Sequence, residues 1–322
     1  IIDFTLSNCL NSHLRRLLVL IQHKSMSLNK HIREGWQMYF VPAFGEYVET
    51  LPAQHRSGDH LYLGTADAIY QNLFVVERDT PEHVLILAGD HVYKMDYRHM
   101  LRYHMETGAD VTVGAVEVSH EDAHLYGILN VDADGRIMAF HEKPKNHALL
   151  PPKPAPCMAS MGIYVFSTKA MAKVLKEDAG RESSSHDFGK DILPRIIKEY
   201  KVHAFRFIDE NKHESQYWRD VGSIDAYYEA NMDLVAVSPL LNLYARDWPI
   251  RSVPLVAPPP KFVFAQEEPG GRLGVALDSV ISPGCIISGG RVQKSVLSPF
   301  VRINSYSSVE DSIIFENVVV GR

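Results

Sequence analysis

The sequence contains few cysteines, and they lie far apart. Cys9, Cys157 and Cys285 are the three among 322 residues. An odd number at such wide spacing argues against a disulfide framework and offers no zinc-binding pattern. The cysteine content is typical of reduced thiols, and we therefore expect a cytoplasmic protein.

Long apolar runs and an excess of basic residues are also missing. No apolar stretch approaches the roughly 20 residues that a membrane-spanning helix needs. Lysine and arginine number 33 against 39 for aspartate and glutamate, which gives a formal net charge of −6. A balance of this kind, without a Lys/Arg run, does not favour nucleic acid or an anionic membrane as a partner. We therefore expect a globular protein of one large domain or two average ones.

The first two thirds of the chain alternate between helical and strand patterns. Residues 6–15 and 25–36 have helical spacing of apolar side chains, and the unbroken apolar run Leu17 to Ile21 between them predicts a strand. Further strands are predicted at 83–87, 111–118, 126–131, 137–141, 159–166 and 202–208. This alternation is typical of the α/β class.

One short stretch in this region has the composition of a ligand site. The apolar run His83 to Leu87 predicts a buried strand, and Gly89 and Asp90 follow it directly. In open parallel sheets, ligands bind at the carboxyl ends of the strands. The Asp90 carboxylate could hold a hard cation such as Mg²⁺ there, or it could cap the following turn or helix. The residues alone favour neither interpretation.

Two other motifs also allow two interpretations each. Gly64 and Thr65 precede a predicted helix, where free backbone N–H groups could bind an anion, although a helix cap at Thr65 is the more common outcome. Glu142 and Lys143 end a predicted strand, where the lysine could bind an anion. At this level a solvated ion pair between the two is the better interpretation.

Two further acids lie in the second half of the domain. Asp220 stands at a predicted strand–helix junction with a glycine two residues later, 130 residues after Asp90. Only the fold could bring these two carboxylates together. His186 and Asp187 form a neighbouring pair that invites interpretation as a catalytic dyad, but no nucleophile stands beside them, and we discount it.

The composition changes from residue 239 onward. Prolines mark residues 239–273 as a linker after a first domain at 1–238. From residue 274 the chain repeats itself, because the motifs that begin at Asp278, Lys294 and Asp311 are alike and start 16 and 17 residues apart. Short strands at this period predict the coils of a β-helix in 274–322. Three coils leave an uncovered edge, and we expect the sequence to be a fragment.

The motifs taken together resemble those of one family. The segments that carry the resemblance are Gly64 to Ala68, Leu85 to Tyr97, Glu142 to Pro144, Ala159 to Val165 and Trp218 to Gly222. In this order, and with the β-helix last, they resemble glucose-1-phosphate adenylyltransferase. The resemblance implies a Rossmann-like nucleotidyltransferase domain with a mixed, mostly parallel sheet, followed by a left-handed parallel β-helix.

The resemblance also implies an activity and partners. It implies that ATP and α-D-glucose 1-phosphate react to ADP-glucose and pyrophosphate, with Mg²⁺ as cofactor, in glycogen or starch synthesis. It implies a homotetramer that phosphorylated metabolite effectors control. The implied site residues are Asp90 and Asp220 for the metal, Lys143 for the sugar phosphate, Glu142 and Ser160 for glucose, Tyr62, Gly64 and Thr65 near the nucleotide, Gly127 near the sugar nucleotide, and Gln54 and Lys261 for effectors.

Two departures from the family pattern qualify these expectations. The Gly-rich loop with the arginine that binds the ATP phosphates has no counterpart in the sequence, and we expect it to precede Ile1. Residues 1–322 alone are therefore expected to be impaired in catalysis. Leu61 stands where many bacterial relatives carry tryptophan, beside the Gln54 loop, which puts the response to activators in doubt.

Two alternative functions stay open at the level of the sequence. The first is a UTP- or dTTP-dependent glucose-1-phosphate nucleotidylyltransferase, which would use the same core chemistry. The second is a regulatory subunit of the same family with weakened catalysis. Asp90, Asp220 and Lys143 are all present, and their presence argues against the second alternative.

Overall fold

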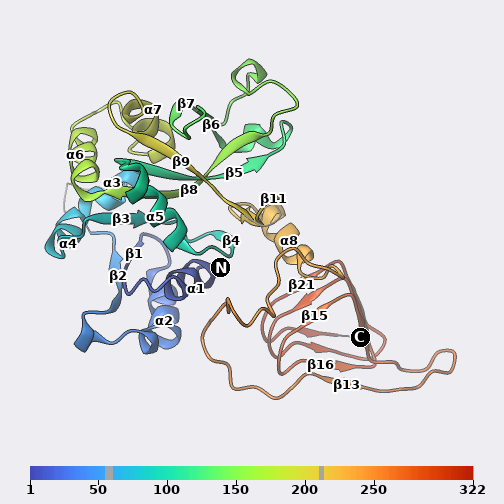
Figure 1. Cartoon of the computed structure of the whole chain (residues 1–322). Helices are drawn as coiled ribbons and strands as arrows, with labels where there is room; N and C mark the ends of the chain where they lie inside the picture. Colours follow the sequence, from blue (N-terminus) through green and yellow to red (C-terminus); the bar gives the residue numbers. More distant parts are fainter. Residues whose placement is uncertain (55–60, 210–213, 322) are drawn as a thin grey trace. The chain divides into compact units, whose positions relative to one another are not determined.

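The computed structural model describes residues 1–54, 61–209 and 214–321 and divides into two compact units (Figure 1). The first, here called the α/β unit, comprises Thr5–Gly89 and Met95–Gln216. The second, here called the β-helix unit, comprises Ile1–Phe4, Asp90–Lys94 and Tyr217–Arg322. Among the described helices, none combines the length and apolar character that a membrane crossing requires.

The α/β unit contains most of the helices of the chain. Its helices are α1 (Asp3–Asn11, whose first two residues belong to the other unit), α2 (Ser25–Gly35), α3 (Thr65–Gln71), α4 (Leu73–Arg78), α5 (Tyr97–Thr107), α6 (Thr168–Ala179) and α7 (Leu193–Ile196). Short turns of 3₁₀-helix are η1 (Gln37–Tyr39), η2 (Pro42–Phe44), η3 (Asp122–Leu125) and η4 (His147–Leu149), and η5 (Phe188–Ile192) is π-helical.

The strands of this unit form one large sheet and two small pairs. They are β1 (Arg16–Ile21), β2 (Tyr47–Pro52), β3 (His83–Ile86), β5 (Val111–Val118), β6 (Gly127–Val131), β7 (Ile137–Glu142), β8 (Cys157–Ser167), β9 (Val202–Arg206), β10 (Ile208–Asp209) and β11 (Glu214–Ser215). The large sheet has the order β7-β6-β8-β5-β9, with β3 also paired to β8. β1 pairs with β2, and β10 with β11.

The expected α/β class and mixed sheet are confirmed, but the strand directions differ from expectation. β8 runs antiparallel to β3, β5 and β6, and β6 runs antiparallel to β7. Among the described pairings of this unit, only β5–β9 and β1–β2 are parallel. The sheet is therefore mostly antiparallel and not mostly parallel, because the long strand β8 shares its two edges with three strands of opposite direction.

The side chains of β5 point alternately to the two faces of the sheet and show which helices cover each face. Val111 and Val113 belong to the main core cluster, to which α6, η5 and α7 also contribute. Successive side chains of a strand point to opposite faces, so Thr112 points the other way. There it is fully buried, and its hydroxyl lies 2.8 Å from Nδ1 of His104 in α5. α5 therefore covers the face opposite to α6.

His104 makes the stability of this unit depend on pH. Its side chain is buried, and burial lowers its pKa from 6.5 to about 4. The neighbouring His83 lowers this pKa further, whereas the charge of Asp110 raises it. The folded state therefore resists protonation while the unfolded state takes up a proton below pH 6.5. Stability is fully present above pH 6.5 and is lost as the pH falls towards about 4.

We expect the His104→Gln variant to lose less stability than the wild type between pH 6.5 and 4. One pKa unit corresponds to about 1.4 kcal/mol, so the difference should approach about 3 kcal/mol. Urea unfolding at a series of pH values measures it. His99→Gln on the exposed side of the same helix is the matched control, and equal pH dependence in both variants would contradict the prediction.

The β-helix unit begins with a small pair of strands and one helix. These are β4 (His91–Tyr93), β12 (Trp218–Asp220) and α8 (Ile224–Asp233). Its remaining strands are β13 (Lys261–Val263), β14 (Val275–Leu277), β15 (Val280–Ile281), β16 (Ile286–Ser288), β17 (Arg291–Gln293), β18 (Val296–Leu297), β19 (Arg302–Ile303), β20 (Ser308–Glu310), β21 (Ile313–Ile314) and β22 (Val319–Val320).

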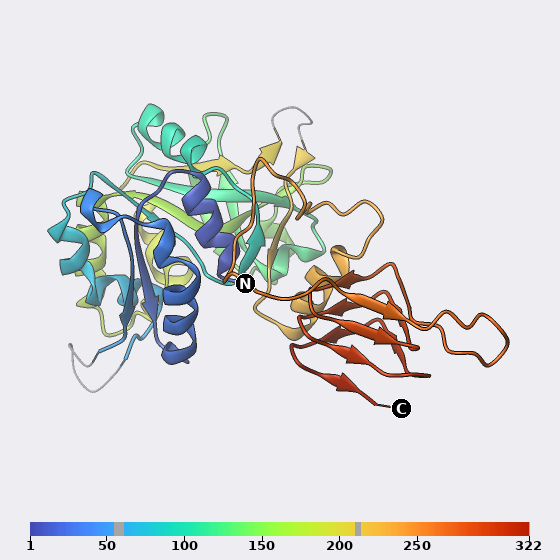
Figure 2. The same cartoon turned by 90° about the horizontal axis from the view of Figure 1, so that it is seen from below.

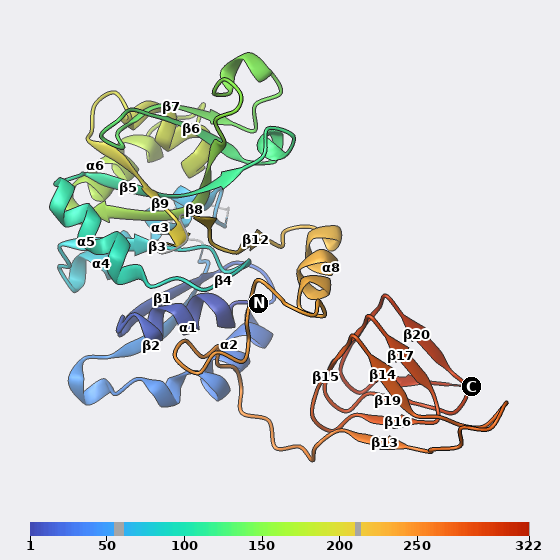
Figure 3. The ribbon, with the colours of Figure 1, turned by 45° about the vertical axis from the view of Figure 1, so that its right-hand side comes forward.

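These short strands form the coils of a parallel β-helix, as the repeat predicts. Three parallel sheets run along it, in the orders β13-β16-β19-β22, β14-β17-β20 and β15-β18-β21. Figure 2 shows the coils stacked on one another, and Figure 3 labels strands on each face. Val280, Val296 and Ile313 pair across consecutive coils, which confirms the predicted repeat.

The first strand of the β-helix lies inside the predicted linker. β13 pairs with β16 from Lys261 to Val263, so the coils begin before the predicted start at residue 274. The linker prediction relied on proline content, which does not exclude a short strand directly after Pro260. The predicted division at residue 238 stays a prediction.

The three cysteines are free and buried, as expected from their number and spacing. Burial raises the pKa of the Cys9 thiol to about 12, so this cysteine remains a neutral thiol. Cys285 belongs to the apolar core of the β-helix together with Ile287 and Val292. These cysteines therefore act as core residues.

Candidate functional site

The fold brings Asp90 and Asp220 together within the β-helix unit. β4 and β12 pair in antiparallel fashion, and Asp220 stands opposite His91. The backbone N–H of Val221 donates to the carbonyl of Asp90 at 3.1 Å. Two acids separated by 130 residues in the sequence thus lie at the ends of adjacent strands.

The imidazole of His91 lies within electrostatic reach of both acids. Burial lowers the pKa of His91, and the charges of Asp90 and Asp220 oppose this effect. Its Nε2 lies 3.8 Å from Oδ1 of Asp90, and its ring packs edge-on against Trp218 at 5.1 Å between centroids. His91 is only 5% exposed and supports the strand pair from the side.

The carboxylates of Asp90 and Asp220 suit a hard divalent cation that takes its remaining ligands from water and substrate. The side chain of Asp90 is 61% exposed and Asp220 is also exposed. In the described part of the chain, no group of three or more His, Cys, Asp or Glu residues could hold a metal. Mg²⁺ is commonly bound by one or two carboxylates, with waters and substrate phosphates as its other ligands. The pair suits such a site.

The alternative role of Asp90 as a helix cap is wrong. The N-cap of α5 is Asp96, whose carboxylate accepts from the backbone N–H of Arg98 at 3.0 Å. Asp90 lies in the turn between β3 and β4, six residues earlier. Its carboxylate therefore stays free of the capping role that the sequence left open.

A second group of candidate residues lies in the α/β unit, at the end of β7. Lys143 follows this strand with a φ of +45°, a left-handed conformation that costs a residue with a side chain about 1–2 kcal/mol. Its side chain is exposed, and the residues described here include no close ion pair between it and Glu142. The local interpretation as a solvated ion pair is therefore not supported.

The carboxylate of Glu142 occupies space that two glycines leave open. A Cβ at Gly127 would lie 3.0 Å from its Oε2 and 2.4 Å from Cζ of Phe140. A Cβ at Gly189 would lie 2.8 Å from the same oxygen. A side chain at either position would displace this carboxylate, and at Gly127 also the ring of Phe140, so both glycines have a steric role beside Glu142.

Charged groups of both signs surround this carboxylate. Burial raises the pKa of Glu142, and Asp187 adds to the effect while Lys143 and Lys190 oppose it. Asp187 and Lys190 were missed as site residues, because the sequence offered only the pair His186–Asp187 and no partner for it. The fold places the charges of Asp187 and Lys190 near Glu142 at the end of β7.

Ser160 joins the same group through the irregular strand β8. The register between β5 and β8 shifts near Gly162, which has a φ of +68°, and such a bulge changes the direction of nearby side chains. The hydroxyl of Ser160 accepts from the N–H of Gly162 at 3.3 Å and hydrogen-bonds to Tyr164. The pKa of Tyr164 is raised by burial, and the charges of Asp187 and Glu142 raise it further.

Thr65 does not cap the helix that it begins. The N-cap of α3 is Gly64, which makes no side-chain cap. The hydroxyl of Thr65 instead lies 3.3 Å from Oδ2 of Asp187 and accepts from the N–H of Phe188 at 3.2 Å. The Gly64–Thr65 motif and Glu142 therefore contact the same segment around Asp187.

Gly64 allows this segment to approach α3. A Cβ there would lie 2.3 Å from the carbonyl oxygen of His186 and 2.4 Å from that of Ser185. Since both are backbone atoms, Gly64→Ala is expected to lower the free energy of unfolding by about 1–3 kcal/mol. Urea unfolding measures this, with Gly180→Ala as control because a Cβ at Gly180 meets nothing closer than 3.8 Å. Equal stability of the two variants would refute the steric argument.

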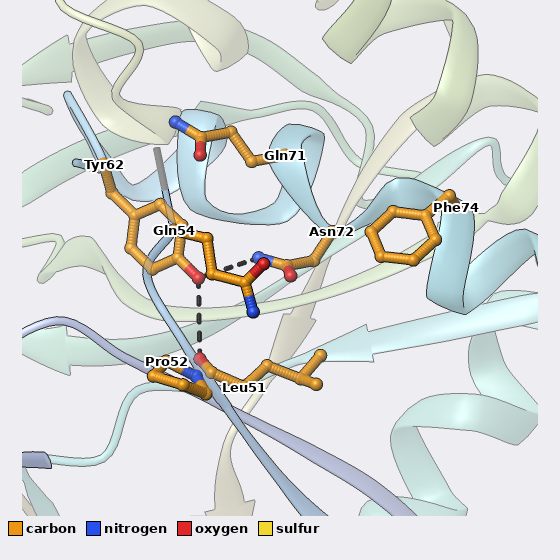
Figure 4. Close-up of a pocket in the computed structure, with 7 residues that line it drawn as sticks. All are labelled: Leu51, Pro52, Gln54, Tyr62, Gln71, Asn72 and Phe74. Atoms are coloured by element: carbon orange, nitrogen blue, oxygen red, sulfur yellow. Dashed lines mark hydrogen bonds between the residues drawn. The ribbon is translucent and has the colours of Figure 1, made fainter. Parts of the chain in front are cut away.

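Tyr62 and Gln54 line one small pocket (Figure 4). The hydroxyl of Tyr62 accepts from the side-chain amide of Asn72 at 2.8 Å and lies 3.5 Å from the carbonyl oxygen of Leu51. The pocket has a volume of about 50 Å³, far below the ~300–1,000 Å³ of typical ligand sites. The structure thus brings the predicted nucleotide residue and a predicted effector residue together.

Lys261 lies on the first strand of the β-helix. Its backbone N–H donates to the carbonyl of Cys285 at 2.8 Å, and its side chain is exposed. It is therefore an exposed side chain on a paired strand. The role of Lys261 in an effector site stays a prediction.

Comparison with protein-family models assigns both parts of the chain. The model described as "Nucleotidyl transferase" matches residues 1–236. The model described as "GlmU-like, C-terminal hexapeptide" matches residues 258–322. This agrees with the predicted nucleotidyltransferase domain and left-handed β-helix, and with the observed start of the coils at Lys261.

Curated relatives match along the whole chain. A glucose-1-phosphate adenylyltransferase of Rhodopirellula baltica is 54% identical over all of this chain and 72% of its own length. Enzymes of the same name from Koribacter versatilis and Teredinibacter turnerae are 51% and 49% identical over all of this chain, and over 77% and 76% of their own lengths. The chain therefore belongs to the nucleotidyl transferase family, among the glucose-1-phosphate adenylyltransferases.

Proposed function

We propose that this protein transfers the adenylyl group of ATP to α-D-glucose 1-phosphate, giving ADP-glucose and pyrophosphate for glycogen or starch synthesis. The observation that carries the proposal is the identity of 49–54% over the whole chain to relatives named for this reaction. The neighbouring acids Asp90 and Asp220 and the exposed Lys143 suit it as well.

The proposed transfer depends more on the neutralisation of phosphate charges than on a general base. The phosphate of glucose 1-phosphate has a second pKa of about 6, so it is already mostly an anionic nucleophile at neutral pH. The difficulty lies in bringing two polyanions together, and such transfers depend on positioning and electrostatics. Asp90 and Asp220 would hold Mg²⁺, whose chemistry is the neutralisation of charge on phosphate oxygens.

Residues of the α/β unit bind and orient the substrates in this proposal. Lys143 binds the phosphate of glucose 1-phosphate, and its exposed ammonium group suits that role. The half-buried carboxylate of Glu142 and the hydroxyl of Ser160 accept hydrogen bonds from glucose hydroxyls. Gly127, proposed near the sugar nucleotide, leaves room for the carboxylate of Glu142 and the ring of Phe140. The residues proposed near the nucleotide are Tyr62, Gly64 and Thr65.

The test is product formation with different nucleotides. The full-length protein is incubated with glucose 1-phosphate, Mg²⁺ and, separately, ATP, UTP or dTTP, and the sugar nucleotides are separated by chromatography. We expect ADP-glucose to form at least tenfold faster than the other products. Faster formation of UDP-glucose or dTDP-glucose would replace the proposal with the sister activity, and absence of all three would support the regulatory-subunit alternative.

The assembly and regulation of the protein are also part of the proposal. We expect a cytoplasmic homotetramer that responds to phosphorylated metabolites, with Gln54 and Lys261 in the response. The exposed side chain of Lys261 suits the binding of an anion. Mass photometry would report the number of subunits directly.

Lys261→Ala is expected to shift the effector concentration for half-maximal response about tenfold, because a cation for the effector phosphate is lost. Turnover without effector should stay near the wild-type value. Initial rates over a series of inorganic phosphate concentrations, with phosphate as the probe for an anionic effector, measure the shift. Lys294→Ala, an exposed lysine elsewhere on the β-helix, is the matched control, and an unchanged curve for Lys261→Ala would rule out the site.

A further inference from the structure

Asp178, near the end of α6, is an almost completely buried carboxylate. It is 2% exposed. Nδ1 of His186 lies 2.8 Å from its Oδ2, and the hydroxyl of Ser184 donates to its two oxygens at 3.0 and 3.1 Å. Nη1 of Arg195 in α7 lies 3.9 Å from its Oδ1. A buried charge is tolerated only with such partners, so Asp178 requires all three of these residues to stay in place.

Two partners of Asp178, Ser184 and His186, belong to a segment that has no regular secondary structure. Residues 184–187 belong to no helix or strand. Within this segment, the N–H of His186 donates to the hydroxyl of Ser184 at 3.0 Å. No backbone ladder holds the segment, and side-chain hydrogen bonds to Asp178 hold it together with bonds to Asp191, whose Oδ2 accepts from the hydroxyl of Ser185 and from the N–H of Asp187.

The opposite side of this segment faces the proposed substrate residues. The carbonyl of His186 accepts from the N–H of Ala66 at 2.8 Å, directly after Thr65. Asp187 contacts Thr65 and accepts from the N–H groups of Gly189 and Lys190 at 2.9 and 3.0 Å. The segment is thus in contact with the proposed nucleotide motif and, through Gly189, with the carboxylate of Glu142.

We propose that Asp178 and His186 are a positioning pair that fixes residues 184–190 and thereby the geometry of both proposed substrate groups. Neither residue needs to touch a substrate. The proposal rests on the proposed function and adds to it a buried anchor outside the residues that bind substrate. It also gives the pair His186–Asp187 its explanation, because His186 pairs with Asp178 and leaves Asp187 for the site.

The proposal predicts a kinetic pattern that differs from loss of a binding residue. His186→Leu keeps a side chain of moderate size but removes the donor to Asp178. We expect the KM values for ATP and for glucose 1-phosphate both to rise about tenfold, since one segment serves both groups. His186→Asn keeps an N–H donor near the position of Nδ1 and should restore most of the affinity. Asp178→Asn tests the pair from the other side.

The experiment combines saturation kinetics with hydrogen exchange of backbone amides in the full-length protein. In His186→Leu, the amides of Ala66 and Lys190 should exchange at least tenfold faster, while amides of the β-helix remain unchanged. Circular dichroism confirms that each variant is folded. Glu177→Gln removes an exposed carboxylate next to Asp178 and serves as the control, with wild-type kinetics and exchange expected.

A folded His186→Leu protein with wild-type KM values and unchanged exchange at Ala66 would overturn the proposal. A rise of equal size in His186→Asn and His186→Leu would also overturn it, because the donor would then not matter. Should the wild type fail to form ADP-glucose, the proposed function would fall, and local exchange at Ala66 and Lys190 alone would decide whether the pair positions the segment. If Asp178→Asn does not fold, the His186 variants carry the test.

Discussion

Asp90→Asn and Asp220→Asn are each expected to lower kcat by about a hundredfold or more. Asparagine keeps the shape of the side chain but removes one negative charge from the carboxylate pair at the ends of β4 and β12. Losing electrostatic stabilisation that acts in the transition state typically costs about 10²–10³ in turnover. The effect on kcat should equal the effect on kcat/KM, since the lost interaction grows during the transfer.

Saturation curves for both substrates at several Mg²⁺ concentrations measure this effect. Each variant should also need more Mg²⁺ for its half-maximal rate, because one anionic ligand is gone. Asp225→Asn, an exposed acid five residues after Asp220, removes the same charge nearby and should stay near wild-type turnover. Near-normal turnover in Asp90→Asn would contradict the proposed role of Asp90 as a metal ligand.

The elements with strong local signals could be predicted from the sequence alone. The predicted strand at 111–118 matches β5, and the predicted helix at 25–36 matches α2 within one residue. Local signals also mark the ends of α5. α5 begins after the capping side chain of Asp96 and ends at Gly108, which has a φ of +57°. Such caps and the spacing of apolar residues are local, so the sequence contains them in full.

Strand direction could not be predicted in the same way. The apolar run of β8 indicates burial, but periodicity is the same for a parallel and an antiparallel strand. The direction follows from which strands meet along β8, and these come from residues 83–86, 111–118 and 127–131. The expectation of a mostly parallel sheet therefore came from family resemblance, and the pairings around β8 contradict it.

The candidate site shows the same division between local and long-range information. Asp90 and Asp220 could be recognised by residue type and position, whereas their meeting at β4 and β12 required the fold. Thr65 was misjudged as a cap because its partner Asp187 lies 122 residues away. The sequence did not indicate Tyr164 as a neighbour of Ser160, because their contact depends on a bulge in β8 that no sequence pattern predicts.

Lys143→Ala is expected to have the second large effect, a loss of affinity for glucose 1-phosphate. Lys143 is proposed to bind a phosphate that is already charged in the ground state. A charge-assisted hydrogen bond contributes roughly 1.5–3 kcal/mol, so the KM for glucose 1-phosphate should rise about ten- to a hundredfold. Since this binding is equally present in the ground state and the transition state, kcat should change much less.

The KM for ATP separates this assignment from its alternatives. If Lys143 binds only the sugar phosphate, Lys143→Ala should leave the KM for ATP within about twofold of the wild type, in contrast to His186→Leu, where both constants should rise. Lys145→Ala removes an exposed positive charge two residues away and should change neither constant. Weaker ATP binding with unchanged glucose 1-phosphate binding in Lys143→Ala would reassign this lysine to the nucleotide. The left-handed turn after β7 would then present its side chain to the triphosphate and not to the sugar phosphate.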